Sequence, residues 1–346
     1  MTAVIGWDLG GANLKLAHLA AGRLVQVAQI PCPIRQEASK FDAALEQGLL
    51  LCPSGATHAV TMTGELSDVF ADRAAGVAYL VDMMRRATGG DVLFYGGRAG
   101  FLDCIRAVEQ SVAVASANWH ASAALLAEVV GDGVLIDVGT TTTDLIPIRA
   151  GEVVAHSHAD GDRLAGGELV YTGVVRTPVM AVARTAPFNG RMQRLAAERF
   201  ATMADVWRLM GELPADADPY PTPDLKGKST QESAARLARM LGRDFGDAGL
   251  LAFADVARHF AETQVAEIEA AADALIMREE IVTDAPVIGA GCGRFIARQA
   301  AQRLGRPYYD FADLIDCVAA MRDMAAVCAP AVAVGLLAER ELALAV

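Results

Sequence analysis

Two short segments of the sequence share a pattern that suits phosphate binding. They read Asp8-Leu9-Gly10-Gly11-Ala12-Asn13-Leu14-Lys15 and Asp137-Val138-Gly139-Thr140-Thr141-Thr142-Thr143-Asp144. Each has an aspartate at the end of an apolar stretch, a glycine two residues later, and small or hydroxylated residues after it. Glycine allows positive φ in a tight turn and lets backbone N–H groups approach an anion. The candidate phosphate ligands are Gly10, Gly11, Asn13, Gly139, Thr140, Thr141 and Thr142.

The two leading aspartates suit a metal ion better than a phosphate. A carboxylate repels phosphate, so we expect Asp8 and Asp137 to hold Mg²⁺, directly or through water. Lys15 places a point charge where a phosphate chain would lie, and it is one of only four lysines in the chain. Taken singly, either segment could be an ordinary hairpin turn. Because the pattern occurs twice, we expect two hairpins that hold one phosphate chain from opposite sides.

A third glycine-rich segment, Gly289-Ala290-Gly291-Cys292-Gly293, lies between an apolar strand-like stretch and a helical pattern. Such a turn lets backbone pack against a nucleotide or a similar ring, and it starts a helix whose N-terminus faces phosphate. Alone the segment is weakly specific. Together with the two hairpins it indicates a binding site, to which we assign Gly289, Gly291 and Gly293.

The elements around these segments indicate an α/β protein with two related halves. The spacing predicts strands near residues 2–7, 14–19, 24–30 and 57–63, and helices over 39–52, 68–88 and 116–130. The opening pattern starts again at 134–136 and 144–148, and a long helix is predicted over 247–280. Residues 178–224 look irregular, like an insertion or cap. Strand hairpins followed by helices, occurring twice, are typical of α/β architecture.

The order of the three glycine segments resembles that of the acetate and sugar kinase, Hsp70 and actin superfamily. Within it the chain is most similar to the hydantoinase/oxoprolinase type, in particular to short members linked to tetrahydromethanopterin-dependent one-carbon metabolism and methanofuran biosynthesis. The closer likeness is carried by both hairpins and by residues 116–119, 160–164, 171–178 and 235–242. The resemblance implies a two-lobed actin-like ATPase (ribonuclease H-like) fold with a central cleft. The implied first lobe spans 1–115 plus 321–346, and the second spans 116–320 with an insertion at about 178–230; each lobe would hold a five-stranded mixed sheet.

The resemblance also implies an activity. It is the condensation of an aminomethylfuran-methyl diphosphate with the phenol of a tyramine- or tyrosine-glutamate acceptor, which releases diphosphate. Positive charge can develop on the furan-methyl carbon as diphosphate leaves, and Mg²⁺, Lys15 and the hairpin N–H groups would stabilise the departing charge. The alternatives are an ATP-dependent kinase, a hydantoinase/oxoprolinase-type amidohydrolase, and a chaperone or scaffold that ATP switches between conformations. ATP is therefore left open as a ligand, although the preferred reaction does not need it.

Further polar residues are candidates for catalysis or substrate binding. Glu65 follows a predicted strand end, where open α/β sheets often carry active-site residues. Asn118 and His120 begin the helix between the halves, although packing of Trp119 alone would also explain that segment. Asp160 is expected in an extended segment, where alternation would put it on one face with His156 and His158, either as a metal arrangement or as a polar strand end that lines the cleft. Asp160 itself could act as a base or as a second Mg²⁺ contact. The candidate catalytic residues are Asp8, Lys15, Asp137, Asp144 and Asp160, and the candidate substrate-binding residues are Glu65, Asn118, His120, Arg163, Lys226 and Lys228.

Lys226 and Lys228 are two of the four lysines and lie in one short loop. They could form a mobile flap that delivers positive charge to an anionic substrate. The alternative is an ordinary solvated loop.

Composition limits the kinds of partner. The chain has 346 residues, of which 53% are hydrophobic, and this excludes a disordered protein. A formal net charge of -12 argues against a nucleic-acid partner. Six separated cysteines without a C-x-x-C pair suit reduced thiols, and no stretch reads as a signal peptide or membrane span. We therefore expect a cytoplasmic enzyme that acts on a small phosphorylated molecule away from membranes, with a homo-oligomer left open.

Overall fold

The computed structural model of the chain describes residues 3–32, 39–90 and 92–344. Contacts divide the chain into two compact units. The first comprises Met1–Gly133, Ile146–Arg163 and Tyr309–Val346, and the second comprises Val134–Leu145 and Leu164–Tyr308. The lobe boundaries expected at residues 115 and 320 stay a prediction.

The first unit is built on a sheet with the strand order β3-β2-β1-β4-β5-β6. The strands are β1 (Val4–Leu9), β2 (Asn13–Ala20), β3 (Arg23–Pro31), β4 (Thr57–Met62), β5 (Val92–Tyr95) and β6 (Phe101–Leu102). The first three form an antiparallel meander, while β4 runs parallel to β1 and β5 runs parallel to β4. Thr2, where the predicted first strand begins, lies outside the described residues.

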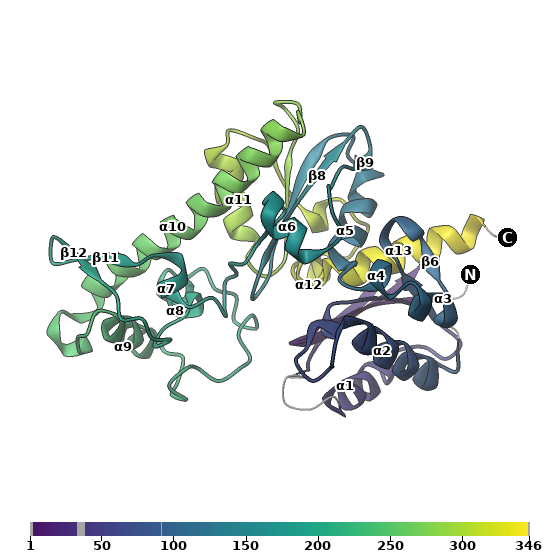
Figure 1. Ribbon diagram of the computed structural model, residues 1–346, viewed down its shortest axis with the longest axis horizontal. Helices are drawn as coiled ribbons and strands as arrows, with labels where there is room; N and C mark the ends of the chain where they lie inside the picture. Colours follow the sequence, from purple (N-terminus) through teal and green to yellow (C-terminus); the bar gives the residue numbers. More distant parts are fainter. Residues whose placement is uncertain (1–2, 33–38, 91, 345–346) are drawn as a thin grey trace. The chain divides into compact units, whose positions relative to one another are not determined.

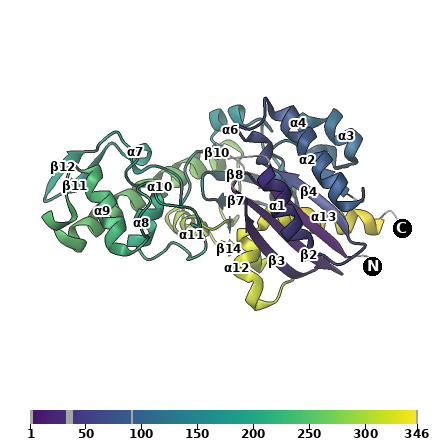
Figure 2. The same ribbon diagram turned by 90° about the horizontal axis from the view of Figure 1, so that it is seen from below.

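Helices cover both faces of this sheet (Figure 1). The helices of this unit are α1 (Ser39–Leu49), α2 (Arg73–Thr88), α3 (Cys104–Glu109), α4 (Ser111–Val114), α5 (Asn118–Ala127), α12 (Arg322–Val327) and α13 (Ala329–Leu344), and α6 (Asp160–Gly166) is divided between the two units. Side chains alternate along β1, so Trp7 lies against Gly48 of α1 while Gly6 lies against Ala331 of α13. A Cβ at Gly6 would be 2.0 Å from the Ala331 carbonyl oxygen, and this close approach requires glycine. Figure 2 shows α12 beside β3.

The second sheet repeats the arrangement of the first. Its order is β10-β8-β7-β13-β14, and β9 also pairs with β8. The strands are β7 (Gly133–Val138), β8 (Thr143–Arg149), β9 (Glu152–Val153), β10 (Leu169–Val170), β13 (Val287–Ala290) and β14 (Tyr308–Asp310). In both sheets a strand parallel to the first strand of the hairpin lies on its other side, β4 in one and β13 in the other. Within the described residues each sheet has six strands rather than the expected five, because the two-residue strands β6 and β9 carry no sequence pattern of their own.

The remaining elements all belong to the second unit and surround one long helix. They are α7 (Val179–Val182), β11 (Thr185–Phe188), β12 (Arg191–Arg194), α8 (Met203–Leu209), α9 (Thr230–Met240), α10 (Gly249–Arg278) and α11 (Arg294–Arg303). The expectation of an irregular stretch over 178–224 is wrong in part, since α7, the β11–β12 hairpin and α8 form there and pack against α10. Trp207 of α8 is buried, and its Nε1 donates to Oε1 of Gln264 on α10 at 2.7 Å. These tertiary contacts stabilise elements too short to show a period in the sequence.

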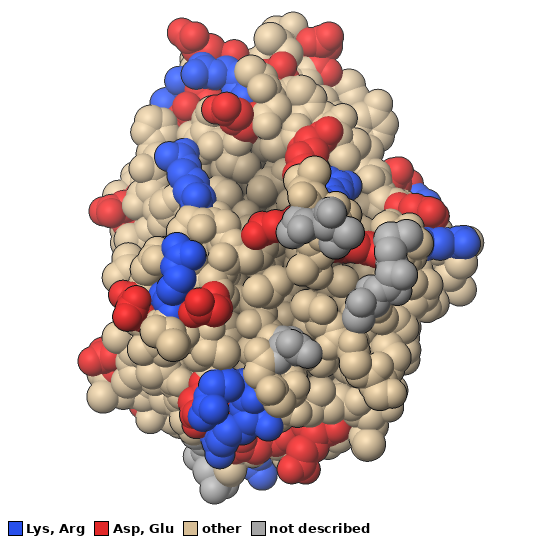
Figure 3. Space-filling model, turned by 90° about the vertical axis from the view of Figure 1, so that its right-hand side faces the viewer, with Lys and Arg blue, Asp and Glu red and all other residues tan. Residues whose placement is uncertain are grey.

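Charged groups are interspersed over a mostly uncharged surface on the face drawn in Figure 3. No single helix in the described ranges is long and apolar enough to cross a membrane. By length and composition alone one pair could, Ala319–Val327 with Ala329–Leu344, which is bent by 102°.

Candidate active site

The first predicted hairpin is formed by β1 and β2, and a local hydrogen bond closes its turn. The N–H of Gly10 donates to the carbonyl oxygen of Asn13 at 3.1 Å. A Cβ at Gly10 would be 2.6 Å from the same oxygen. Neither Gly10 nor Gly11 has a positive φ, so the expectation of left-handed turn geometry is wrong here. Gly10 is needed because the turn leaves no space for a side chain.

Asp8 and Lys15 are cross-strand partners on this hairpin, with Lys15 Nζ 3.6 Å from Asp8 Oδ2. Burial raises the pKa of the Asp8 carboxyl group, and Lys15 opposes this shift. Oδ1 of Asp8 and Oδ1 of Asn13 are both buried without a hydrogen-bond partner in the described chain. A buried carboxylate with an unsatisfied oxygen requires a further cation or a proton.

These two oxygens fit Mg²⁺, which prefers oxygen ligands. Within residues 3–32, 39–90 and 92–344, no group of three or more His, Cys, Asp or Glu side chains could hold a metal by itself. Mg²⁺ is commonly bound by one or two carboxylates and completes its coordination with water and substrate phosphates. The first hairpin therefore suits a metal that binds together with a phosphorylated substrate.

The second predicted hairpin, between β7 and β8, closes in the same way. The N–H of Gly139 donates to the carbonyl oxygen of Thr142 at 2.9 Å, and Gly139 also lacks a positive φ. A neighbouring segment lies directly on the turn, because a Cβ at Gly173 would be 2.5 Å from the Thr141 nitrogen. The N–H groups of residues 174–176 donate to the carbonyl oxygens of Gly139 and Thr140. These contacts fix the threonine-rich turn against residues 173–176 within the second unit.

The third glycine segment packs against the end of β7. Gly291 has φ of +80°, and a Cβ there would be 2.3 Å from the Val138 carbonyl oxygen and 2.4 Å from Oδ1 of Asp137. The N–H of Gly293 donates to the same Val138 oxygen at 2.9 Å. The structure thus brings the predicted glycine segment together with Asp137.

Two other candidates of the second unit have defined neighbours. A Cβ at Gly289 would overlap the ring of Tyr308, so this glycine makes room for an aromatic side chain. Asp144 is half-buried on β8, opposite Leu169 of β10. The roles predicted for Gly289 and Asp144 stay predictions.

Glu65 has the most unusual setting of the predicted residues in the first unit. It lies just beyond β4, is 1% exposed, and accepts a hydrogen bond at Oε1 from the Ser116 hydroxyl at 2.9 Å. Its Oε2 is buried without a hydrogen-bond partner in the described chain. Burial is the main reason that the pKa of Glu65 is raised to about 6; the negative charge of Asp160 adds to this shift, and the hydrogen bond from Ser116 opposes it.

Aromatic and imidazole rings gather at the start of α5. The Tyr95 hydroxyl and His120 Nδ1 are 2.9 Å apart, and the exposed ring of His158 lies 5.6 Å from Trp119 and 5.5 Å from His120. The guanidinium of buried Arg163 lies over the Trp119 ring, 4.1 Å from its centroid. The predicted residues His120 and Arg163 therefore belong to one cluster of the first unit. Half-buried Asn118 is the first residue of α5, and its role stays a prediction.

The expected extended segment at Asp160 is wrong, because Asp160 is the first residue of α6. Its carboxylate pairs with Arg73 at 3.0 Å. A helix start removes the alternation on which a His156–His158–Asp160 metal site depended. Sequence reasoning missed Arg73, Tyr95 and Ser116 as members of the site. Ser116 opens one of the segments that carry the family likeness, whereas Arg73 and Tyr95 gave no sequence signal.

Comparison with known proteins identifies the family of this chain. The hydantoinase/oxoprolinase family matches residues 56–333. The chain belongs to this family. The matched range includes Glu65, the second hairpin and the third glycine segment, and it begins after the first hairpin.

Two curated relatives of this hydantoinase/oxoprolinase-family chain carry the same name, (4-{4-[2-(gamma-L-glutamylamino)ethyl]phenoxymethyl}furan-2-yl)methanamine synthase. The protein of Methanocaldococcus jannaschii is 32% identical over 242 residues, which are 70% of this chain and 72% of that protein. The protein of Methanococcus vannielii is 32% identical over 111 residues, which are 32% of this chain and 50% of that protein.

The fold is similar to that of a solved acetone carboxylase in its nucleotide-free form. The TM-score is 0.58 at 11% sequence identity, and the match covers 97% of this chain and 70% of that one. At this identity the likeness concerns the fold alone. With the repeated strand order of the two sheets, it confirms the predicted class, an actin-like ATPase fold with ribonuclease H-like units.

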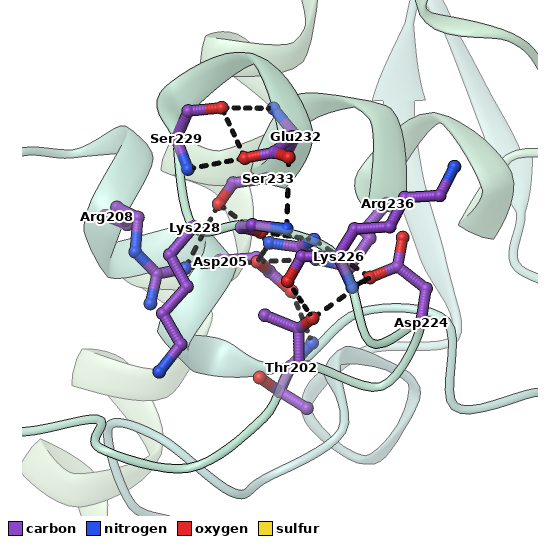
Figure 4. A network of polar contacts seen from close by, with 12 residues as sticks. Thr202, Asp205, Arg208, Asp224, Lys226, Lys228, Ser229, Glu232, Ser233 and Arg236 are labelled. Atoms are coloured by element: carbon purple, nitrogen blue, oxygen red, sulfur yellow. Dashed lines mark hydrogen bonds and ion pairs between the residues drawn. The ribbon is translucent and has the colours of Figure 1, made fainter.

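The two predicted flap lysines of this family member differ in setting. Lys226 is exposed, whereas Lys228 is half-buried and its Nζ lies 3.3 Å from Oδ2 of Asp218. Figure 4 shows that a polar network ties their loop to α8 and α9. At its centre the buried Arg236 binds Oδ1 of Asp205 at 2.7 Å and Oδ1 of Asp224 at 3.1 Å. Substrate binding by the lysines stays a prediction, with the ordinary loop as its alternative.

Replacing Arg236 with alanine should destabilise the second unit by about 3–5 kcal/mol, because the change leaves the buried carboxylate of Asp205 without its main partner. Arg239→Ala is the matched control, since Arg239 is 42% exposed and its NH1 lies 3.5 Å from the same Asp224. The control should cost roughly 0–1 kcal/mol. Urea unfolding followed by tryptophan fluorescence measures both, and equal midpoints for the two variants would contradict the central role of Arg236.

Proposed function

We propose that this enzyme forms an aryl ether in the biosynthesis of a methanofuran-type one-carbon carrier. The observation that carries the proposal is the 32% identity, over 70% of the chain, to a synthase whose product name contains a phenoxymethyl group on a furan-2-yl-methanamine. In that name the ether oxygen joins a phenyl ring to a methylene carbon on the furan. The proposed reaction makes this bond.

The donor is an aminomethylfuran-methyl diphosphate, and the acceptor is the phenol of a tyramine- or tyrosine-glutamate. The bond between the methylene carbon and the diphosphate oxygen breaks, and its electron pair leaves with diphosphate. The phenol oxygen forms the new bond to the same carbon, and the phenol proton is released. Because positive charge develops on the carbon and negative charge on the leaving group, groups that stabilise the diphosphate should dominate catalysis.

The residues of both hairpins have the chemistry for this task. Lys15 and the turn N–H groups would bind phosphate oxygens, and the hydroxyl groups of Thr140–Thr142 would add donors. Asp8 and Asp137 would hold Mg²⁺, which when bound supplies positive charge to the leaving group. The buried and unsatisfied Oδ1 of Asp8 supports this role. The proposal includes that one diphosphate is bound by both hairpins.

A two-substrate assay tests the proposal. Purified protein is mixed with the furan diphosphate, the phenolic acceptor and Mg²⁺, without nucleotide; the ether is followed by mass spectrometry and diphosphate by a coupled phosphate assay. We expect ether and diphosphate in equal amounts. When the acceptor is left out, the enzyme should release no diphosphate. A requirement for ATP would indicate a kinase. Opening of a hydantoin or oxoproline ring would indicate an amidohydrolase, and ATP hydrolysis without either reaction would indicate a chaperone or scaffold. Each of these results would contradict the proposal.

A further inference from the structure

The proposed condensation needs a group that takes the phenol proton, and Glu65 has the setting for it. Parallel strands end at the same edge of a sheet, and the register pairs Asp8 with Thr61 and Leu9 with Met62. Glu65 is three residues beyond Met62, the last residue of β4. It therefore lies at the edge of the sheet where the Asp8 hairpin also turns. One carboxylate oxygen is held by Ser116, while the other is buried and has no hydrogen-bond partner in the described chain.

Ser116, which donates the hydrogen bond to Oε1 of Glu65, has a strained backbone conformation. Ser116 is a buried residue with φ of +53°, a conformation that non-glycine residues adopt at a cost and that clusters at functional sites. Glu65 is also fixed from the other side, because a Cβ at Gly76 of α2 would be 2.6 Å from the Glu65 carbonyl oxygen. Packing of Gly76 thus fixes the backbone of Glu65, and the Ser116 hydroxyl binds its carboxylate.

The charged groups around Glu65 leave it available to accept a proton. Asp160 at the start of α6 repels a negative charge on Glu65, but its own carboxylate is paired with Arg73 of α2. On α5, His120 is bonded to Tyr95, and burial lowers the pKa of His120 to about 4, so it is neutral near pH 7. The β1–β2 hairpin contributes Asp8, which faces Lys15. Further titratable or charged groups near His120 are His158, Arg98 and Arg163.

We propose that Glu65 is the proton acceptor for the phenol and that Ser116 is its positioning residue. This inference rests on the proposed ether synthesis. The phenol O–H bond breaks and its proton goes to Oε2 of Glu65, while the oxygen attacks the furan-methyl carbon and diphosphate leaves with the electron pair of the broken bond. The proton then passes from Glu65 to water, which restores the carboxylate. Oδ2 of Asp160 is paired with Arg73 and Nδ1 of His120 with Tyr95, whereas Oε2 of Glu65 has no hydrogen-bond partner in the described chain.

The sign of the pH dependence follows from this role. Glu65 must be ionised to accept a proton, so kcat/KM of the native enzyme should fall as pH drops through about 6, the pKa to which burial raises Glu65. The Ser116 hydrogen bond lowers this pKa. Ser116→Ala should therefore raise the pKa and move the acid limb of the profile to higher pH.

The test uses the full chain, the furan diphosphate and two acceptors, a tyramine-type phenol with a pKa of about 10 and a polyfluorinated phenol already ionised at the assay pH. Glu65→Gln should lower kcat/KM roughly 10²–10⁴-fold with the ordinary phenol, and much less with the ionised one. Glu46→Gln, an exposed change on α1, should behave as the native enzyme, and circular dichroism checks that each variant folds.

The outcomes separate this inference from the proposed function. Equal losses with both phenols, or full activity of Glu65→Gln, would overturn the role of Glu65 while leaving ether synthesis intact. If Glu65→Gln does not fold, an unshifted acid limb in Ser116→Ala would overturn it instead. If the native enzyme forms no ether with either acceptor, both the proposed ether synthesis and the role of Glu65 are wrong. This result would be seen before any variant is compared.

Discussion

Replacing Asp8 or Asp137 with asparagine is expected to lower kcat at least roughly 10²–10³-fold, the scale seen when one group that stabilises transition-state charge is removed. Asparagine keeps the shape of the side chain but lacks the negative charge that would hold Mg²⁺. At position 8 it also leaves the charge of Lys15 without its cross-strand partner. The measurement is steady-state ether formation over a range of Mg²⁺ concentrations.

The fold should survive these changes. Burial already disfavours the charged form of Asp8, so a neutral amide at this position removes a cost of folding. Asp82→Asn is the control, because Asp82 is an exposed carboxylate on α2 that pairs with its helix neighbours Arg85 and Arg86. Thermal unfolding near that of the native protein with kcat strongly reduced is the expected result. Full activity in both Asp8→Asn and Asp137→Asn would contradict the metal-binding role.

Gly291→Ala is expected to destabilise the second unit by roughly 2–5 kcal/mol and to reduce turnover with it. The left-handed φ costs an alanine about 1–2 kcal/mol, and forcing a methyl group into a packed site costs about 1–3 kcal/mol. The methyl group would be 2.4 Å from Oδ1 of Asp137, so that carboxylate or the glycine segment must move. Urea unfolding and ether formation are measured on the same preparation.

A second glycine separates the two contributions. Gly190 in the β11–β12 turn has φ of +75°, and a Cβ there would have nothing within 4 Å. Gly190→Ala should therefore lower the free energy of unfolding only by the cost of the left-handed φ, about 1–2 kcal/mol. Turnover should stay unchanged. Equal losses of stability in the two variants would show that contact with Asp137 does not matter.

Much of the architecture could be predicted from the sequence because it depends on local patterns. Apolar runs that end in Asp-x-Gly predicted β1 and β7, and the long apolar period predicted α10. The short elements β6, β9 and α8 gave no such signal. Among them α8 is stabilised by contacts such as Trp207 with Gln264, 57 residues apart.

The sequence by itself determined the two hairpin turns, because each is closed by a hydrogen bond between residues three apart, Gly10 with Asn13 and Gly139 with Thr142. Only the tertiary structure decided which residues surround them. Glu65 and Ser116 are 51 residues apart, and Gly291 meets Asp137 through the pairing of β13 with β7. Such contacts depend on how strands and helices pack. The types of two residues and their separation along the chain do not predict that packing will bring them together. The raised pKa of Glu65 has the same origin, since burial is a property of the folded chain.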